Sequence, residues 1–192
     1  TFDNVPQGRR ILIPWLRAPS PGMPFNQCLG LPQELGLART AEGVKLTRHP
    51  VAELTALRER TAAFGPFEAA AGTSQPLTDL RAELLELHIV CSLSPDADVM
   101  FNVLGIPLRY HATQQELTLV THKTTWPIKD GKLALILFVD RTCVELFSQD
   151  GLMYAPVAAI ADPKLETVTW TVVAGQAKAV RGSAHALRSI WP

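Results

Sequence analysis

The regular alternation of short apolar segments with turn residues is the feature that most constrains the fold of this chain. From residue 98 onward, apolar segments of about five to eight residues recur at intervals of about ten residues. Asp130-Gly131 and Asp150-Gly151 lie between such segments, and Asp-Gly favours hairpins because the turn requires positive φ angles. We therefore predict an all-β fold, a two-sheet antiparallel β-sandwich of the jelly-roll or concanavalin-like kind. The strands expected in this part are 99–104, 107–111, 116–122, 132–139, 143–147, 152–160, 167–173, 178–181 and 185–191.

The N-terminal part is less regular than the rest. Residues 10–16 form a compact apolar run that indicates a strand, and Pro14 is expected to end it early or to place it at a sheet edge. Residues 18–24 hold three prolines and one glycine, which predicts a stiff, extended connector and a domain boundary. The segments 27–31, 34–39 and 44–48 indicate further strands with a hairpin at Glu42-Gly43.

Two segments carry a helical spacing. Val51, Leu54 and Leu57 follow Pro50 at helical intervals, so we predict one short helix or helical turn near residues 51–58. Residues 77–93 fit a helix and an extended strand about equally well from their pattern, and both alternatives stay open at this point.

Composition excludes several classes of function. The chain is 47% apolar and 19% charged, enough to bury a core, and its 18 basic and 18 acidic side chains give no net charge. Electrostatic binding of nucleic acid or of an anionic membrane over a broad surface is therefore not expected. No apolar stretch is long enough to span a membrane, and no signal peptide is visible at the N-terminus, so localisation stays open.

The sequence offers no convincing metal or nucleophile site. His88 and Cys91 are three residues apart and Asp96 and Asp98 follow, but positions three apart on a strand point to opposite faces. We expect Cys91 in the core, His88 exposed, and no metal or cofactor. The three cysteines form no zinc signature and no dense disulfide framework, and no Gly-x-Ser-x-Gly or papain-like motif surrounds Cys143.

No pair of carboxylates has the spacing that catalysis needs. Glu83 and Glu86 would face opposite ways on a strand, as would Asp140 and Glu145, whereas glycoside hydrolysis needs two carboxyl groups across one bond. We therefore predict no catalytic residue. The charged pattern Asp140, Arg141 and Glu145 instead indicates a structural motif, in which Arg141 pairs with a carboxylate and braces a hairpin, because charges near a core need partners.

Tryptophan side chains are the candidates for contact with a sugar, because their flat apolar faces stack on sugar rings. Trp126 lies in a polar stretch and is expected to be the most exposed, and Trp15 is the second candidate. Trp170 alternates with valines and is expected in the core, and Trp191 lies near the C-terminal end.

The segment around Asp140 resembles a known family. Residues 133–151, Leu-Ala-Leu-Ile-Leu-Phe-Val-Asp-Arg-Thr-Cys-Val-Glu-Leu-Phe-Ser-Gln-Asp-Gly, closely resemble the C-terminal β-sandwich of glycoside hydrolase family 32, which includes invertases, levanases, inulinases and other β-fructosidases. Residues 8–15 look like the last strand of the family's catalytic propeller, and 24–35 like the segment that leaves it. Residues 50–58 look like the family's linker, and 186–191 like its closing strand.

The resemblance implies a domain organisation and favours a strand for residues 82–93. Residues 1–23 would be a remnant of the last propeller strand with the Pro-rich connector, and residues 24–192 the β-sandwich, including a linker at 50–60. The family's catalytic aspartate in Trp-x-Asn-Asp-Pro-Asn, its acid/base glutamate in Glu-Cys and its Arg-Asp-Pro aspartate do not occur in this sequence. They belong to a propeller that would precede residue 1.

The predicted function is therefore a non-catalytic C-terminal β-sandwich module that supports a catalytic propeller. Its partner would be that propeller or a second copy of the chain. The strand at 10–16 cannot stay unpaired, so we expect it to pair with the sandwich, with a second copy or with a missing catalytic piece. The alternative from another class is a free-standing module that binds a carbohydrate such as fructan or sucrose through Trp126 or Trp15. A third hypothesis is an enzyme in its own right, which the lack of a carboxylate pair disfavours.

Overall fold

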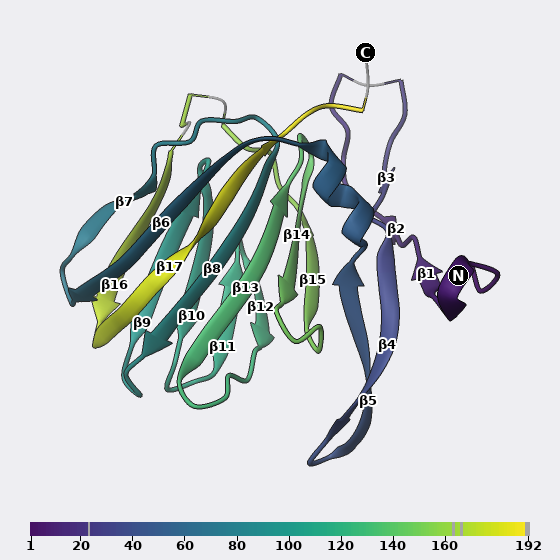
Figure 1. The fold of residues 1–192 in the computed structure, drawn as a ribbon. Helices are drawn as coiled ribbons and strands as arrows, with labels where there is room; N and C mark the ends of the chain where they lie inside the picture. Colours follow the sequence, from purple (N-terminus) through teal and green to yellow (C-terminus); the bar gives the residue numbers. More distant parts are fainter. Residues whose placement is uncertain (23, 163, 166, 191–192) are drawn as a thin grey trace.

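Strands make up most of the chain, as the spacing of its apolar segments predicts. The computed structural model describes residues 1–22, 24–162, 164–165 and 167–190, of which nearly all regular structure is β. Two antiparallel six-stranded sheets pack face to face (Figure 1). The predicted two-sheet β-sandwich is confirmed. No helix among the described residues is long and apolar enough to cross a membrane.

The first sheet has the strand order β12-β11-β10-β9-β16-β7, and the second has the order β15-β14-β13-β8-β17-β6. The strands of the first sheet are β7 (Ser74–Thr78), β9 (Asp98–Val103), β10 (Ile106–His111), β11 (Glu116–Leu119), β12 (His122–Thr125) and β16 (Val168–Ala174). Those of the second are β6 (Arg58–Ala70), β8 (Leu85–Leu93), β13 (Lys132–Val139), β14 (Cys143–Ser148), β15 (Tyr154–Ala158) and β17 (Gln176–Leu187).

The inner faces of the two sheets form one apolar core. On β8, the alternate residues Leu85, Leu87, Ile89 and Cys91 are essentially fully buried in this core. Each such aliphatic side chain stabilises the fold by about 1.5–3 kcal/mol relative to an exposed position. The period of two decides the ambiguous segment in favour of a strand from Leu85, and the expected core position of Cys91 is confirmed.

Residues 1–50 form a separate layer, here called the N-terminal layer. β1 (Arg10–Leu12) pairs with β4 (Gln33–Thr40), which forms a hairpin with β5 (Gly43–Pro50). β2 (Trp15–Leu16) pairs with β3 (Cys28–Leu29) in a short ribbon. The layer also holds the 3-10 turn η1 (Pro6–Gly8), and the 3-10 helix η2 (Ala52–Leu57) connects it to β6. The β4–β5 hairpin projects beside the sandwich (Figure 1).

The predicted local structure of this layer is largely confirmed. The hairpin at Glu42-Gly43 and the helical turn near residues 51–58 are both present, and the run 10–16 is divided into two strands at Ile13-Pro14. The strand at 10–16 was expected to pair with the sandwich, with a second copy of the chain or with a missing catalytic piece, and in the structure it pairs with β4 and β3 of this same chain.

The structure corrects three predicted strand segments and adds the strand β6, which was not predicted. Segment 116–122 is not one strand, because Val120 takes a positive φ and a two-residue turn folds β12 back onto β11. The segment 178–181 and the first part of 185–191 are joined in the single strand β17, which ends at Leu187 and whose pairing with β8 shifts register between Lys178 and Arg181. β6 was not predicted, because its alanine-rich sequence has no clear alternation and tertiary pairing with β17 decides its conformation. Trp191 lies outside the described residues.

The end of β5 contacts the sandwich at Gly151, in the turn between β14 and β15. Gly151 has φ +74°, and its carbonyl accepts a hydrogen bond from Arg48 N at 2.8 Å. A Cβ atom on Gly151 would lie 2.4 Å from His49 Nε2. The predicted Asp-Gly turn therefore needs glycine both for its backbone conformation and for the close approach of the N-terminal layer.

We expect Gly151→Ala to lower the free energy of unfolding by about 2–4 kcal/mol, because alanine adds left-handed strain and a clash with His49. Gly72→Ala is the matched control, since Gly72 has φ +87° and open space around its Cβ position, and should cost about 1–2 kcal/mol. Urea unfolding of both variants measures the difference, and equal losses would contradict the proposed contact.

Candidate functional site

A buried carboxylate on β14 joins the N-terminal layer to the sandwich. Glu145 lies on the opposite face of β14 from the core residues Val144 and Leu146, yet it is only 3% exposed. Its carboxylate accepts a hydrogen bond from Leu31 N at 2.7 Å and one from the Tyr154 hydroxyl at 2.5 Å. Leu31 and Glu145 are 114 positions apart, so this contact ties two distant segments together.

The surroundings of Glu145 leave little free space. A Cβ atom on Gly30 would lie 3.1 Å from Glu145 Oε2 and 2.8 Å from Pro14 Cγ, so the chain passes closely over the carboxylate. Gln33 is fully buried nearby, and its amide has no hydrogen-bond partner among the described residues. The hydrogen bonds to Glu145 therefore come from Leu31 and Tyr154.

Burial dominates the ionisation of this group. Burial raises the pKa of Glu145, and the negative charge of Asp140 adds to this, against the hydrogen bonds from Tyr154 and Leu31. Burial, followed by the Glu145 charge, also raises the pKa of the Tyr154 hydroxyl, which keeps its proton and remains a donor. The arrangement has one carboxylate and two donors, so it can anchor a segment but has no second acid for glycoside hydrolysis.

The other residues of the predicted motif point elsewhere. Asp140 is exposed and accepts a hydrogen bond from Arg141 N at 2.7 Å. Arg141 pairs with Glu83 at 2.9 Å, which links the β13–β14 turn to the segment before β8. The structure therefore separates Asp140 and Arg141 from the buried Glu145. The sequence analysis missed Tyr154 and Leu31, because a phenol and a backbone amide leave no recognisable pattern.

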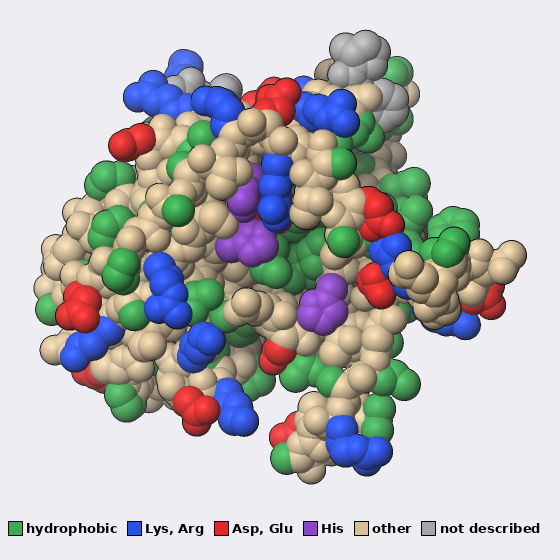
Figure 2. Space-filling view, viewed as in Figure 1, with side chains coloured by type: hydrophobic (Ala, Val, Ile, Leu, Met, Phe, Trp, Pro, Cys, Tyr) green, Lys and Arg blue, Asp and Glu red, His purple; other side chains and the backbone are tan. Residues whose placement is uncertain are grey.

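A second polar cluster lies on the outer face of the second sheet, and the sequence analysis missed it. Arg58 donates two hydrogen bonds to Glu86, at 2.7 and 2.5 Å, and His88 Nε2 lies 2.6 Å from Glu86 Oε1. Register places His185 of β17 opposite Glu86 of β8. Figure 2 shows histidine side chains beside a basic side chain on this face. The alternation of Glu86 and His88 was the available signal, but the contribution of His185 required the sheet order.

Hydrogen bonds from its neighbours keep Glu86 ionised. Burial opposes ionisation of Glu86, but hydrogen bonds from Arg58 and then His88 outweigh it and lower the pKa of Glu86 to about 2. Burial and the Arg58 charge lower the pKa of His185. Both nitrogens of His185 lie within hydrogen-bond distance of hydroxyls, Nδ1 of Thr61 at 2.8 Å and Nε2 of Ser183 at 2.9 Å.

This cluster has a donor set that a transition metal could use, since the ligand atoms of Glu86, His88 and His185 lie within 4.8 Å of one another. However, the guanidinium of Arg58 already bonds both oxygens of Glu86, and a second cation there would meet its positive charge. We therefore interpret the cluster as an ion-pair network that stabilises the sheet.

The two tryptophans proposed for sugar contact differ sharply in their exposure to solvent. Trp126 was expected to be exposed, and this is wrong: it is 1% exposed, and its carbonyl accepts a hydrogen bond from the Tyr110 hydroxyl. The polar residues before it form the edge strand β12, and the indole turns into the core. Trp15 is 62% exposed, with the Arg17 guanidinium 5.5 Å from its ring centre. Trp170 is buried, as predicted.

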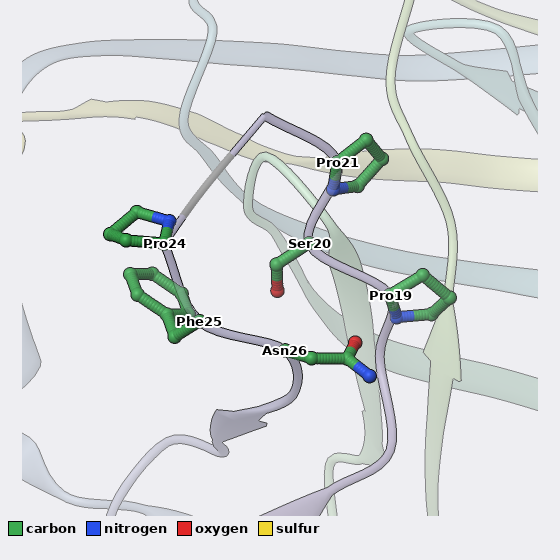
Figure 3. A pocket seen from close by; sticks show the side chains of 6 residues that line it. All are labelled: Pro19, Ser20, Pro21, Pro24, Phe25 and Asn26. Carbon is green, nitrogen blue, oxygen red and sulfur yellow. The ribbon is translucent and has the colours of Figure 1, made fainter.

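A hollow of about 530 Å³ lies in the bend of the Pro-rich connector (Figure 3). Its lining residues are Pro19, Ser20, Pro21, Pro24, Phe25 and Asn26. None of these side chains is a carboxylate, so the hollow does not provide the pair of acids that sugar hydrolysis requires.

Comparison with known sequences aligns the whole chain with one part of longer enzymes. No protein-family model matches the chain. It is 22% identical over 223 residues to a levanase from Bacillus sp. (strain L7), covering all of this chain and 24% of that protein. It is also 22% identical over 226 residues to a levanase from Bacillus subtilis (strain 168), covering 33% of that protein. The chain therefore spans a quarter to a third of the length of these relatives.

Solved structures share the fold. Exo-inulinase from Aspergillus awamori matches with a TM-score of 0.75 at 14% identity, over 94% of this chain and 41% of that chain. The family 32 β-fructofuranosidase from Bombyx mori matches with a TM-score of 0.63 at 16% identity, over 95% of this chain and 39% of that chain.

These matches and the strand order show that the chain has the β-sandwich fold found in a solved glycoside hydrolase family 32 enzyme. More particularly, the predicted resemblance to the C-terminal β-sandwich of β-fructosidase-like enzymes is confirmed, since all of the chain aligns with only part of each levanase.

The raised pKa of Glu145 predicts a dependence of stability on pH. The folded state holds this proton more tightly than the unfolded state, so stability is highest below the unfolded pKa near 4.5 and falls as pH rises through the folded pKa. We expect Glu145→Gln, which is always neutral, to lack this decrease. Urea unfolding of both proteins between pH 4 and 8 measures it, and parallel curves would contradict an effect of Glu145 ionisation.

Arg58→Met should lower the free energy of unfolding by about 3 kcal/mol at pH 7, because it leaves the charge of Glu86 buried without its main partner. Arg141→Met is the matched control, since the exposed pair of Arg141 with Glu83 should be worth at most about 0.5 kcal/mol. Adding Glu86→Gln to Arg58→Met should recover part of the loss. Similar effects of the two arginine substitutions in chemical denaturation would refute the burial argument.

Proposed function

We propose that this chain is a non-catalytic module whose N-terminal layer docks against the catalytic propeller of a β-fructosidase-like enzyme. The proposal rests on the exposed apolar side chains of that layer. In the ribbon, the cross-strand neighbours Trp15 and Leu29 are 62% and 70% exposed. Apolar side chains grouped in this way favour contact with a partner.

The hairpin carries a second group, here called the hairpin patch and defined by Leu37, Val44 and Leu46. Leu37 and Leu46 are directly paired across the strands, and Val44 lies two residues before Leu46, so all three share one face. All three are exposed, Leu37 by 76%. The hairpin projects beside the sandwich, which leaves this face open to a partner (Figure 1).

The length of the relatives supports a propeller as that partner. The levanases are three to four times longer than the aligned region, and in them this region is joined to the remaining chain. The family's catalytic motifs are absent from the 192 residues, so hydrolysis of a β-fructoside would be the work of the propeller. The module would stabilise it by covering apolar surface on both sides of the interface.

The test is to produce the chain and the catalytic propeller encoded by the same gene as two polypeptides and to measure their association by calorimetry. We expect Leu37→Asp with Leu46→Asp to weaken binding at least about tenfold, because it places two charges in an apolar contact. Val173→Asp, at an exposed position on β16, is the control and should bind like the unchanged chain.

Other outcomes would overturn the proposal. A gene that encodes no Trp-x-Asn-Asp-Pro-Asn propeller would remove the partner, and hydrolysis of sucrose or levan by the chain alone would remove the non-catalytic role. Heat of binding to sucrose or levan that is lost in Trp15→Ala would instead support the carbohydrate-binding alternative.

A further inference from the structure

The ribbon of the N-terminal layer holds one of two cysteines that the fold brings together. Cys28 lies on β3, and Cys143 is the first residue of β14. The two pack in one small apolar cluster with Leu16 and Ala18, separate from the main core. The sequence shows no relation between them, because the contact depends on how the ribbon crosses the sandwich.

The path of the chain supports a direct contact between the two thiols. Cys143 and Glu145 are alternate residues of β14 and therefore share its outer face. Three residues after Cys28, Leu31 N bonds Glu145, so the segment from Cys28 to Leu31 runs over the segment from Cys143 to Glu145. Gly30 N also bonds Pro14 O at 2.7 Å, which fixes the ribbon in this place. The Cys28 side chain therefore packs against the cluster that contains Cys143.

We propose that Cys28 and Cys143 are a site of disulfide formation that fastens the N-terminal layer to β14. The co-reactant is a low-molecular-weight disulfide such as oxidised glutathione. The more accessible thiolate, that of Cys28, attacks the disulfide of the reagent, forms a mixed disulfide and releases one glutathione thiolate. The Cys143 thiolate then attacks the Cys28 sulfur, the protein disulfide forms, and the second glutathione leaves. Two protein thiols are oxidised and one glutathione disulfide is reduced to two thiols, which take up, through solvent, the two protons that the protein thiols lose.

The disulfide would stabilise the β2–β3 ribbon, which is held by few backbone hydrogen bonds. The ribbon has only two paired positions, Trp15 with Leu29 and Leu16 with Cys28, so it depends on its contacts with β14. A disulfide here closes a loop of 116 residues, from Cys28 to Cys143, and closing a long loop restricts the unfolded chain strongly. The exposed face at Trp15 and Leu29 would then be held in place for the partner described above, but the bond itself does not depend on that proposal.

The third cysteine provides an internal control. Cys91 is buried in the main core on the inner face of β8, and burial raises its pKa to about 12. Burial and the nearby carboxylates Glu145 and Asp140 also raise the pKa of Cys143, so the reaction is best run at mildly alkaline pH.

The test is to incubate the folded chain with oxidised glutathione at pH 8.5, alkylate the remaining thiols after denaturation, and map the peptides by mass spectrometry. We expect the intact mass to fall by two hydrogen atoms, a peptide pair joined through Cys28 and Cys143, and alkylated Cys91. The melting temperature should rise by about 5–10 °C and return on reduction. Cys91→Ala should behave in the same way, and Cys28→Ser should lose both changes.

The proposal is overturned if Cys28 and Cys143 both remain open to alkylation, if Cys28 keeps a glutathione adduct without transfer to Cys143, or if the bond joins Cys91 or two chains. The readout is independent of binding to a propeller, so failure of the proposed function would leave this result unaffected.

Discussion

The placement of the N-terminal layer depends on one buried carboxylate. Glu145 stands on the outer face of β14, where a sandwich strand would ordinarily meet water, and the chain at Gly30 and Leu31 covers it. A buried carboxylate is costly unless hydrogen bonds compensate, so the position is tolerable only when Leu31 and Tyr154 are both in place. The same requirement makes the contact specific, because a segment that covered Glu145 without bringing Leu31 N to it would bury the carboxylate without that donor.

The sandwich provides the rigid support for this contact. Two sheets share one apolar core, and β8 and β13 lie next to one another in the second sheet with eight paired positions. On the outer face of the same sheet, Arg58 and Glu86 form a further buried interaction between β6 and β8. The outer face of this sheet thus carries polar groups that pair with one another.

Much of the fold could be predicted from the sequence, and the residues show why. The spacing of the apolar segments after residue 98 and the Asp-Gly turns depend on local chemistry, so they could be recognised in the sequence alone. β6 and the turn at Val120 could not be predicted, because the first takes its conformation from pairing with β17 and the second places a β-branched residue at positive φ. Trp126 was wrongly expected to be exposed because its sequence neighbours are polar. The exposure of a single side chain is decided by tertiary packing, which buries this indole.

The sequence by itself determined the β-sandwich, its apolar faces and the resemblance to family 32, because periodicity, turn residues and a contiguous motif are all local properties. Only the tertiary structure decided which distant groups meet. It brought Leu31 to Glu145, His185 to Glu86 and Cys28 to Cys143, because strand order and the crossing of the ribbon set those distances. Spacing along the chain carries no information about contacts between residues that lie about a hundred positions apart.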